Sequence, residues 1–321
     1  HCLVGSEMCI RDRACTAHLQ CYCRVCACFR PLYATPVHSQ SWSLCSAGGA
    51  QMNEIDKVFS GSIPDVYDEY LVPLIFEVFA QDLAQRVAQQ KPLTVLETAA
   101  GSGVVTRALM PMLAPDARYW ATDLNAPMLE RAKRMQASDD RIEWQVADAL
   151  ALPFEDDSFD AVCCQFGVMF FPDRVEGYRE ARRVLKPGGR FFFNVWDGIE
   201  DNAFADVVTR VATEVFPEDP PLFLARTPHG YGDVAKIQAD LRAAGYENLS
   251  IDTISETSAA PNARHPAIAY CEGTPLRNEI EARDASRLAE VTERAALAIA
   301  EKYGEGPVAA KIQGHVVTAI A

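Results

Sequence analysis

The sequence predicts an α/β fold in which a doubly wound, mostly parallel sheet of seven strands carries helices on both faces. Three observations predict it. From residue 92, short apolar runs alternate with longer segments of helical spacing, as in parallel sheets with crossover helices. The run 159–166 is apolar almost throughout, which is typical of a strand covered on both faces. Glycine or acidic residues directly follow several runs, as at strand ends that border a ligand site.

The N-terminal elements follow from the spacing of their apolar residues. Residues 63–87 have helical spacing and are expected to form one or two helices that cover the sheet. The alternation then predicts strands at 93–96, 118–122, 142–146, 159–166 and 190–196, with helices at 103–113, 126–136 and 173–185. The sequence Lys-Pro-Gly-Gly at 186–189 is expected to form the turn before the fifth of these strands.

The C-terminal part continues the alternation after an insertion near residues 200–230. A helix is expected at 233–244 and is closed by Gly245. A strand at 249–254, a long helical run at 277–303 and a last strand at 315–320 complete the prediction. These elements are expected to form one domain over residues 52–321.

Residues 1–51 differ from the rest in composition. They hold eight of the eleven cysteines, and they carry a net charge of +2 against −16 for the remaining residues. The thiols between Cys21 and Cys28 lack the two separated pairs of a zinc site, and no apolar core of a secretory signal is present. We expect residues 1–51 to be a non-native or disordered leader, with Met52 as the natural start, and we expect no metal.

The composition excludes several classes of protein. The chain has 321 residues, of which 49% are hydrophobic and 23% are charged, as in ordinary globular proteins. A net charge of −14 argues against a protein that binds nucleic acid along its phosphates. No run of eighteen apolar residues is present, so no membrane span is expected. A cytoplasmic location is expected, and the oligomeric state stays open.

The candidate site begins with the loop after the first strand. In an open parallel sheet, ligands bind beyond the carboxyl ends of the strands. The loop Glu-Thr-Ala-Ala-Gly-Ser-Gly at 97–103 contains Gly101 and Gly103, which allow a tight turn and a close approach of the backbone to a ligand. The next helix directs its free N–H groups into the same space. Two glycines in such a turn also occur without a ligand.

Acidic residues follow the next strands. Asp123 can accept hydrogen bonds from both hydroxyls of a ribose, although it could also cap the helix that follows. Asp148 can accept from an exocyclic amine such as that of adenine, and Gln165 ends the fourth strand. Because Glu97, Asp123 and Asp148 recur at equivalent strand ends, we expect them to converge on one pocket for an adenosine-bearing ligand.

The third glycine of the dinucleotide fingerprint is absent. Thr106 stands at that position, where close packing of helix on strand requires glycine. Glu97 also places a negative charge near the helix N-terminus, which a pyrophosphate would avoid. The acidic loop suits a ligand with an ammonium and a sulfonium group, so the loop favours S-adenosylmethionine over a dinucleotide.

Five motifs in order resemble the class I S-adenosylmethionine-dependent methyltransferases. They lie at 95–103, 121–129, 147–160, 165–169 and 183–190, and the resemblance covers about residues 55–321. It is to the small-molecule branch with quinone-ring methyltransferases, known as methyltransferase type 11. It implies a Rossmann-like fold, with a cofactor half at about 92–197 and substrate-side elements at 55–90 and 198–312.

The resemblance also implies roles for single residues. The loop would hold the methionine part, Asp123 the ribose and Asp148 with Ala149 the adenine, while Leu124 and Met128 pack on the adenine ring. The implied cofactor-binding residues are Glu97, Ala99, Gly101, Gly103, Asp123, Leu124, Met128, Asp148, Ala149 and Gln165.

Two positions depart from the pattern of these relatives. Ala99 stands where many of them have glycine, although the quinone-type relatives also show alanine there. The segment 166–173 keeps the phenylalanine and the glycine of the quinone enzymes but lacks their Arg-Asn-Val run. The acceptor therefore stays open.

The implied reaction is O- or C-methylation of a phenol, a quinone or a similar small-molecule acceptor by in-line displacement. A base that removes a proton from the acceptor would assist it. The candidates are His229, in a loop that could border the cleft, and Tyr67 and Tyr70, in the N-terminal cover. Each could instead serve packing or capping. A non-catalytic regulator or partner subunit that binds the cofactor remains an alternative, and a dinucleotide-dependent oxidoreductase is a weaker one.

Overall fold

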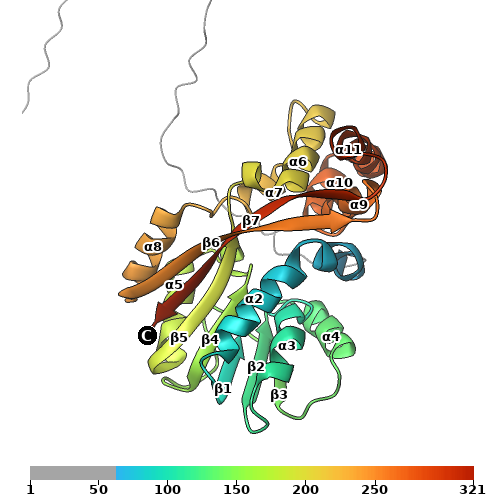
Figure 1. The fold of residues 1–321 in the computed structure, drawn as a ribbon. Helices are drawn as coiled ribbons and strands as arrows, with labels where there is room; N and C mark the ends of the chain where they lie inside the picture. Colours follow the sequence, from blue (N-terminus) through green and yellow to red (C-terminus); the bar gives the residue numbers. More distant parts are fainter. Residues whose placement is uncertain (1–62) are drawn as a thin grey trace, which may run out of the picture. The chain divides into compact units, whose positions relative to one another are not determined.

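The computed structural model describes residues 63–321, so the predictions for residues 1–51 lie outside the described residues. Seven strands form one sheet in the order β3-β2-β1-β4-β5-β7-β6 (Figure 1). The strands are β1 Thr94–Glu97, β2 Arg118–Asp123, β3 Ile142–Val146, β4 Phe159–Gln165, β5 Leu185–Trp196, β6 Asn248–Ala260 and β7 Val308–Ile320. The first five are parallel, and β7 is antiparallel to both of its neighbours. The predicted fold class is confirmed.

The order of the strands reverses at β1. The chain moves outward from β1 to β2 and β3, then returns to place β4 on the other side of β1. Leu96 of β1 pairs with Trp120 of β2 and with Val162 of β4. The carboxyl ends of these three strands are therefore adjacent, and such a reversal opens a crevice in which ligands bind.

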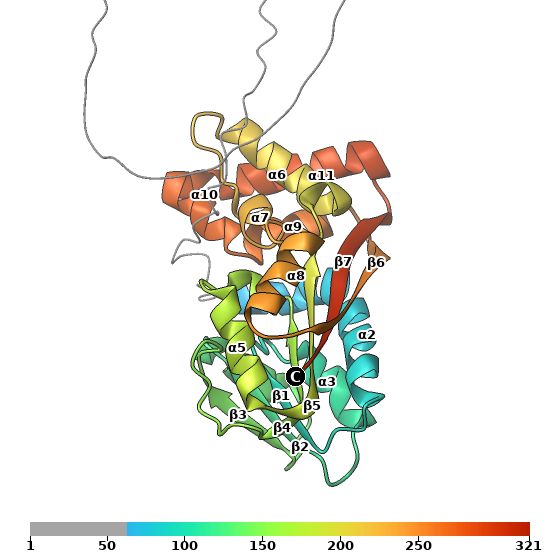
Figure 2. The ribbon, with the colours of Figure 1, turned by 90° about the vertical axis from the view of Figure 1, so that its left-hand side faces the viewer.

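Helices cover both faces of the sheet, with α2 and α3 on one face and α5 and α8 on the other (Figures 1 and 2). The longer helices are α2 Glu77–Ala88, α3 Val104–Leu109, α4 Ala126–Met135, α5 Arg174–Val184, α6 Ala203–Val215, α8 Val234–Ala243, α9 Arg264–Glu272, α10 Leu276–Asp284 and α11 Leu288–Tyr303. Asp173 and Asp233 cap α5 and α8 through their carboxylates, as N-terminal aspartates do.

The N-terminal cover consists of α1 Ile63–Val66, the π-helical segment η2 Tyr67–Phe76 and α2. In η2 the N–H of Glu77 donates to the carbonyl of Val72, five residues earlier. Pro73 lies inside this segment, and a proline inside a helix removes one regular hydrogen bond. π-helical turns are rare and are frequent at functional sites.

A second group of helices lies beyond the carboxyl ends of the parallel strands. It comprises α6, α7 Phe223–Arg226, α9, α10 and α11 (Figures 1 and 2). The long strands β6 and β7 extend past the others and bring the chain to this group, where α6 and α11 contact β7. Helix α9 also contacts η2 of the cover. The sequence did not predict α9.

Two sequence predictions are wrong in detail. The expected turn at 186–189 lies inside β5, which begins at Leu185: the register passes from Phe159↔Leu185 to Ala161↔Arg190, so the segment bulges out of the strand. The expected continuous helix at 277–303 is interrupted at η6 Ala285–Arg287. Asp284 is extended there, and its carboxylate accepts from the N–H of Ser286, which competes with helix continuation.

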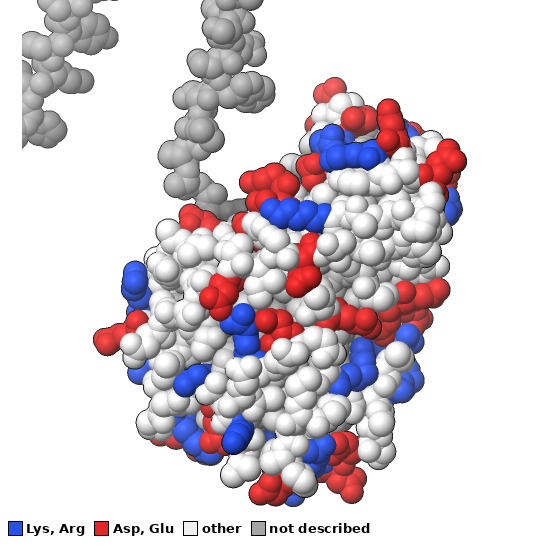
Figure 3. All heavy atoms as spheres, viewed as in Figure 1, with Lys and Arg blue, Asp and Glu red and all other residues white. Residues whose placement is uncertain are grey.

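Acidic and basic side chains are interspersed over the face of the described residues in Figure 3. Within residues 63–321 no helix is both long and apolar enough to cross a membrane.

Candidate active site

A pocket lies at the carboxyl ends of β1, β2 and β4, where the strand order reverses. The volume of the pocket, including its solvent-filled opening, is about 1290 Å³. The strand ends supply one side, the η2 segment of the cover supplies another, and α7 and α9 with the loops that follow them supply the rest. Eight of the ten predicted cofactor-binding residues line it, and Glu97 and Gly103 do not.

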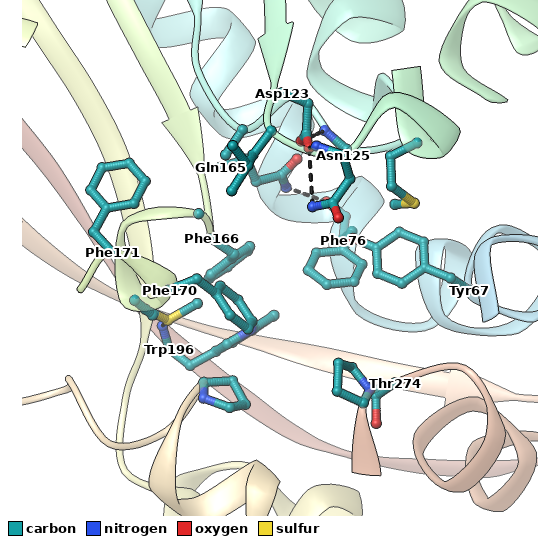
Figure 4. A pocket seen from close by; sticks show the side chains of 18 of the residues that line it. Tyr67, Phe76, Asp123, Asn125, Gln165, Phe166, Phe170, Phe171, Trp196 and Thr274 are labelled. Carbon is teal, nitrogen blue, oxygen red and sulfur yellow. Dashed lines mark hydrogen bonds between the residues drawn. The ribbon is translucent and has the colours of Figure 1, made fainter. Parts of the chain in front are cut away.

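Asp123, at the end of β2, organises the polar end of the pocket (Figure 4). One carboxylate oxygen accepts from the N–H of Gly101 at 2.8 Å, and the other accepts from the N–H of Asn125 at 2.7 Å. Burial raises the pKa of this carboxyl above its ordinary value, although the two N–H donors oppose the rise. The carboxylate therefore ties the loop after β1 to the loop after β2.

The remaining polar-end residues follow β2 and β3. Asp148 is exposed, and its carboxylate accepts from the N–H of Leu150 at 2.9 Å. Ala149 lies beside it on the pocket wall. Leu124 is 53% exposed and Met128 is buried, and both line the same end. The apolar side chains of Leu124 and Met128, with the carboxylate of Asp148 beside the pocket opening, can hold a flat polar ring.

Three residues of the loop after β1 have positive φ angles, and of these only Ala99 is strained. Ala99, Gly101 and Gly103 have φ angles of 51°, 57° and 80°, a region that L-residues other than glycine rarely adopt. A Cβ on Gly103 would lie 3.0 Å from Cβ of Ala132, on α4. Gly103 therefore serves the packing of the loop against α4, whereas Ala99 and Gly101 face the pocket.

Glu97 does not converge with the other two acids, contrary to the expectation from the sequence. It is 1% exposed, and its Oε2 accepts from Thr106 Oγ1 at 2.5 Å and from the Tyr119 hydroxyl at 2.6 Å. Burial raises its pKa to about 7. Thr106, at the position of the missing glycine, thus connects α3 to the end of β1. Glu97 supports the loop through buried hydrogen bonds and does not face the pocket.

Aromatic side chains form the other end of the pocket. The rings of Phe166 and Trp196 are stacked, with centroids 3.8 Å apart and an interplanar angle of 6°. Phe76, from the cover, lies 5.6 Å from Phe166 and 5.9 Å from Trp196 (Figure 4). Phe170 and Phe223 also line this end. Such walls suit a flat apolar ring.

Sequence reasoning missed most of this aromatic end. Trp196 is the last residue of β5. The sequence predicts site residues at the ends of the first four strands, and the same reasoning applied to the fifth strand would have found Trp196. Phe76 and Phe223 lie on helices distant in sequence, and no local signal separates them from ordinary core residues. The loops after β1 and β4 are in close contact, since a Cβ on Gly167 would lie 2.5 Å from Cβ of Ala99.

Gln165 connects the strand end to the cover. Its Nε2 donates to the carbonyl of Phe76 at 2.9 Å, and the residue lines the pocket (Figure 4). The adjacent Cys163 and Cys164 are buried free thiols, and burial raises the pKa of Cys164 to about 12. These cysteines therefore serve as packing residues of the buried strand.

The three candidate bases occupy different places. His229 lines the aromatic end and is 8% exposed; Tyr67 lines the pocket near Phe76, with ring centroids 5.1 Å apart. Tyr70 is not among the lining residues, and its ring packs on His265 at 4.8 Å. Burial lowers the pKa of His229 to about 4 and raises that of Tyr67.

Comparison with known proteins finds a family match in the middle of the chain. Residues 96–193 match the family model described as "Methyltransferase domain". This part of the chain is therefore similar to methyltransferase domains, as the resemblance implied, and such a domain implies S-adenosylmethionine as the cofactor.

Curated relatives are similar to part of this chain. A demethylmenaquinone methyltransferase of Clavibacter sepedonicus is 47% identical over 96 residues, which are 30% of this chain and 38% of the relative. One from Staphylococcus aureus (strain JH9) is 33% identical over 143 residues, 44% of this chain and 59% of the relative. The matches thus span less than two thirds of either relative.

A solved structure extends the likeness of the fold. The YcgJ protein of Bacillus subtilis superposes with a TM-score of 0.50 at 18% identity, over 76% of this chain and 98% of that one. The likeness covers more of the chain than the family model does, and it concerns the fold alone.

Proposed function

We propose that this chain transfers a methyl group from S-adenosylmethionine to a small-molecule acceptor. The observation that carries the proposal is one pocket with two chemically distinct ends. Acids and backbone N–H groups at the strand ends make one end, and stacked aromatic rings make the other. A nucleoside with a charged tail fits the first end, and an apolar acceptor fits the second.

The residues of the polar end fit the donor. Asp123 accepts two N–H groups, but a carboxylate offers about four lone-pair sites, so two ribose hydroxyls can still bind to it. Asp148 and Ala149 lie where the adenine edge would bind, with Leu124 and Met128 against the ring. The loop at Ala99 and Gly101 would hold the methionine part.

Bound S-adenosylmethionine supplies an activated methyl group on a sulfonium. The protein contributes orientation and exclusion of water. Holding two reactants in line at near-attack distance lowers a barrier by about 7–11 kcal/mol at best. The aromatic end can hold an acceptor in this way because its lining from Phe76, Phe166 and Trp196 is buried and the rings of Phe166 and Trp196 are stacked.

Titration calorimetry tests the proposal. The purified chain is titrated with S-adenosylmethionine, with its demethylated product and with a nicotinamide dinucleotide. We expect the first two to bind at micromolar concentration and the dinucleotide to be silent. Binding of the dinucleotide alone would exclude the proposal.

Turnover separates an enzyme from a binding subunit. Both would bind the donor, but only an enzyme releases the demethylated product in proportion to an added acceptor. Donor binding without turnover on any of the phenols, quinones, amines and carboxylic acids supplied would support the non-catalytic alternative.

A further inference from the structure

We propose that His229 accepts the proton of an uncharged hydroxyl group on a flat aromatic acceptor, which makes the methylated atom an oxygen. The inference rests on the proposed function and specifies its acceptor class. It combines three features of the described residues: the orientation of one imidazole, the composition of the pocket wall and the geometry of the aromatic end.

The imidazole of His229 is held in one orientation. Its Nδ1 lies 2.9 Å from the carbonyl oxygen of Asp197, and its backbone N–H donates to the carbonyl of Leu224. A carbonyl can only accept, so the hydrogen of the neutral ring is on Nδ1. The other nitrogen, Nε2, is then an acceptor on a residue that lines the pocket. The ring centroid is 6.0 Å from that of Trp196.

His229 is the suitable base among the titratable lining residues. Asp123 and Asp148 belong to the polar end. Tyr67 and Tyr270 have pKa values raised by burial, so both keep their protons at neutral pH. Burial lowers the pKa of His229 to about 4, so its imidazole is neutral at neutral pH.

Asp197 is the charged group that acts on His229. Its carboxylate oxygens are already engaged: one accepts from the N–H of Gly198 and lies 3.3 Å from His315 Nε2, and the other accepts from Gln313. The backbone carbonyl of Asp197, rather than its carboxylate, contacts the imidazole. His229 is therefore oriented without being paired to an anion.

The pocket wall selects an uncharged acceptor. No lysine or arginine is among the lining residues in the described part of the chain. A carboxylate or phosphate on the acceptor would be desolvated there without a positively charged side chain as its partner, which is costly. The stacked Phe166 and Trp196, with Phe170 beside them, favour a flat ring. A phenol-like hydroxyl satisfies both conditions and donates to Nε2.

The chemical step balances. The acceptor oxygen forms a bond to the methyl carbon as the bond from that carbon to sulfur breaks, and the bonding pair remains on sulfur as a thioether. The hydroxyl proton moves to Nε2 of His229. As the new bond forms, the hydroxyl becomes a protonated ether, a far stronger acid than imidazolium, so even a weakly basic imidazole can take the proton. The proton then passes to solvent.

The test uses His229→Asn, because the amide of asparagine can still donate to the carbonyl of Asp197 while the Nε2 acceptor is lost. The acceptor panel contains phenols, anilines and benzoic acids of matched size, at saturating S-adenosylmethionine. We expect the wild-type protein to methylate phenols and the variant to lose about 100-fold or more in kcat. The KM for the donor should change less than threefold. The matched control is His265→Asn, outside the pocket lining, which should keep full activity.

The pH profile separates a base from a structural residue. The wild-type kcat should be nearly constant between pH 6 and 8. In His229→Asn the phenol must ionise in advance, so kcat should rise about tenfold per pH unit below the phenol pKa, and acidic nitrophenols should recover most of the loss.

Three outcomes would overturn the inference. One is an unchanged kcat with a flat pH profile in His229→Asn. Another is turnover of anilines or benzoic acids in preference to phenols. The third is turnover of another acceptor but of no phenol. Because methyl transfer is observed in each of these, they are distinct from failure of the proposed function, in which the donor does not bind or no acceptor is methylated.

Discussion

The two ends of the pocket are assembled in different ways. The polar end uses residues close in sequence, from the loop at 97–103 to Ala149, at the ends of three adjacent parallel strands. The aromatic end joins η2, the segment after β4, the end of β5, and the α7 and α9 regions. The first end is a property of one sheet edge. The second exists only after separate parts of the chain have packed together.

The difference indicates how the two ends can vary. Local hydrogen bonds such as that from the Gly101 N–H to Asp123 fix the polar end. Ring packing holds the aromatic end, together with hydrogen bonds such as those from Gln165 to the Phe76 carbonyl and from His229 to the Asp197 carbonyl. Under the proposed function, substitutions on the cover or on α7 would change the acceptor without disturbing the donor.

The largest expected effect concerns Glu97, the buried carboxyl at the end of β1. Burial raises the pKa of Glu97 from 4.5 to about 7. Between pH 4.5 and 7 this carboxyl is protonated in the folded state and ionised in the unfolded state. Its contribution to the stability of the folded state therefore falls as the pH rises from 4.5 to 7. Glu97→Gln removes that dependence. We expect the variant to gain about 3 kcal/mol relative to wild type between pH 5 and 8, measured by urea denaturation at both values. A pH-independent difference would show that Glu97 ionises normally.

The next largest effect is at the junction of the two ends. A Cβ on Gly167 would lie 2.5 Å from Cβ of Ala99 and 2.7 Å from Sγ of Cys164. Gly167→Ala should therefore cost about 1–3 kcal/mol of stability and weaken binding at both ends. Gly306→Ala is the control, because a Cβ there meets nothing within 4 Å. If both variants melt at the wild-type temperature, the two loops are not tightly packed.

A smaller effect would isolate the polar end. Asp123→Ala removes the carboxylate proposed to hold the ribose, and we expect donor affinity to fall about tenfold or more, equivalent to about 1.4 kcal/mol. Affinity for the acceptor should change little. The comparison variant is Asp116→Ala, at an exposed acid outside the pocket lining. Calorimetry that shows equal donor affinity in both variants would exclude the ribose role.

The smallest effect concerns backbone strain at the polar end. Ala99 has a φ of 51°, which glycine adopts at no steric cost. Ala99→Gly relieves that strain but adds freedom to the unfolded chain. These terms oppose each other, so the free energy of unfolding, measured by thermal denaturation, should change by less than about 1 kcal/mol. A large loss would mean that the alanine methyl group is itself needed, by contact with Gly167.

The prediction from sequence succeeded where local pattern and burial agree. Alternating apolar runs located the parallel strands because those strands are covered on both faces, and Asp173 and Asp233 marked true helix starts. It failed at 186–189 and at 285–287, where a bulge and an aspartate interrupt regular elements. It placed Glu97 toward the ligand, because sequence does not show which way a side chain at a strand end points.

The sequence by itself determined the sheet, its helices and the strand-end positions of Asp123 and Asp148, because periodicity and turn chemistry act over a few residues. Only the tertiary structure decided that Glu97 lies beneath the loop and that Phe76, Trp196 and His229 meet in one pocket. Those contacts depend on packing between segments far apart in the chain. Burial there also lowers the pKa of His229, and no local pattern reports burial of that kind.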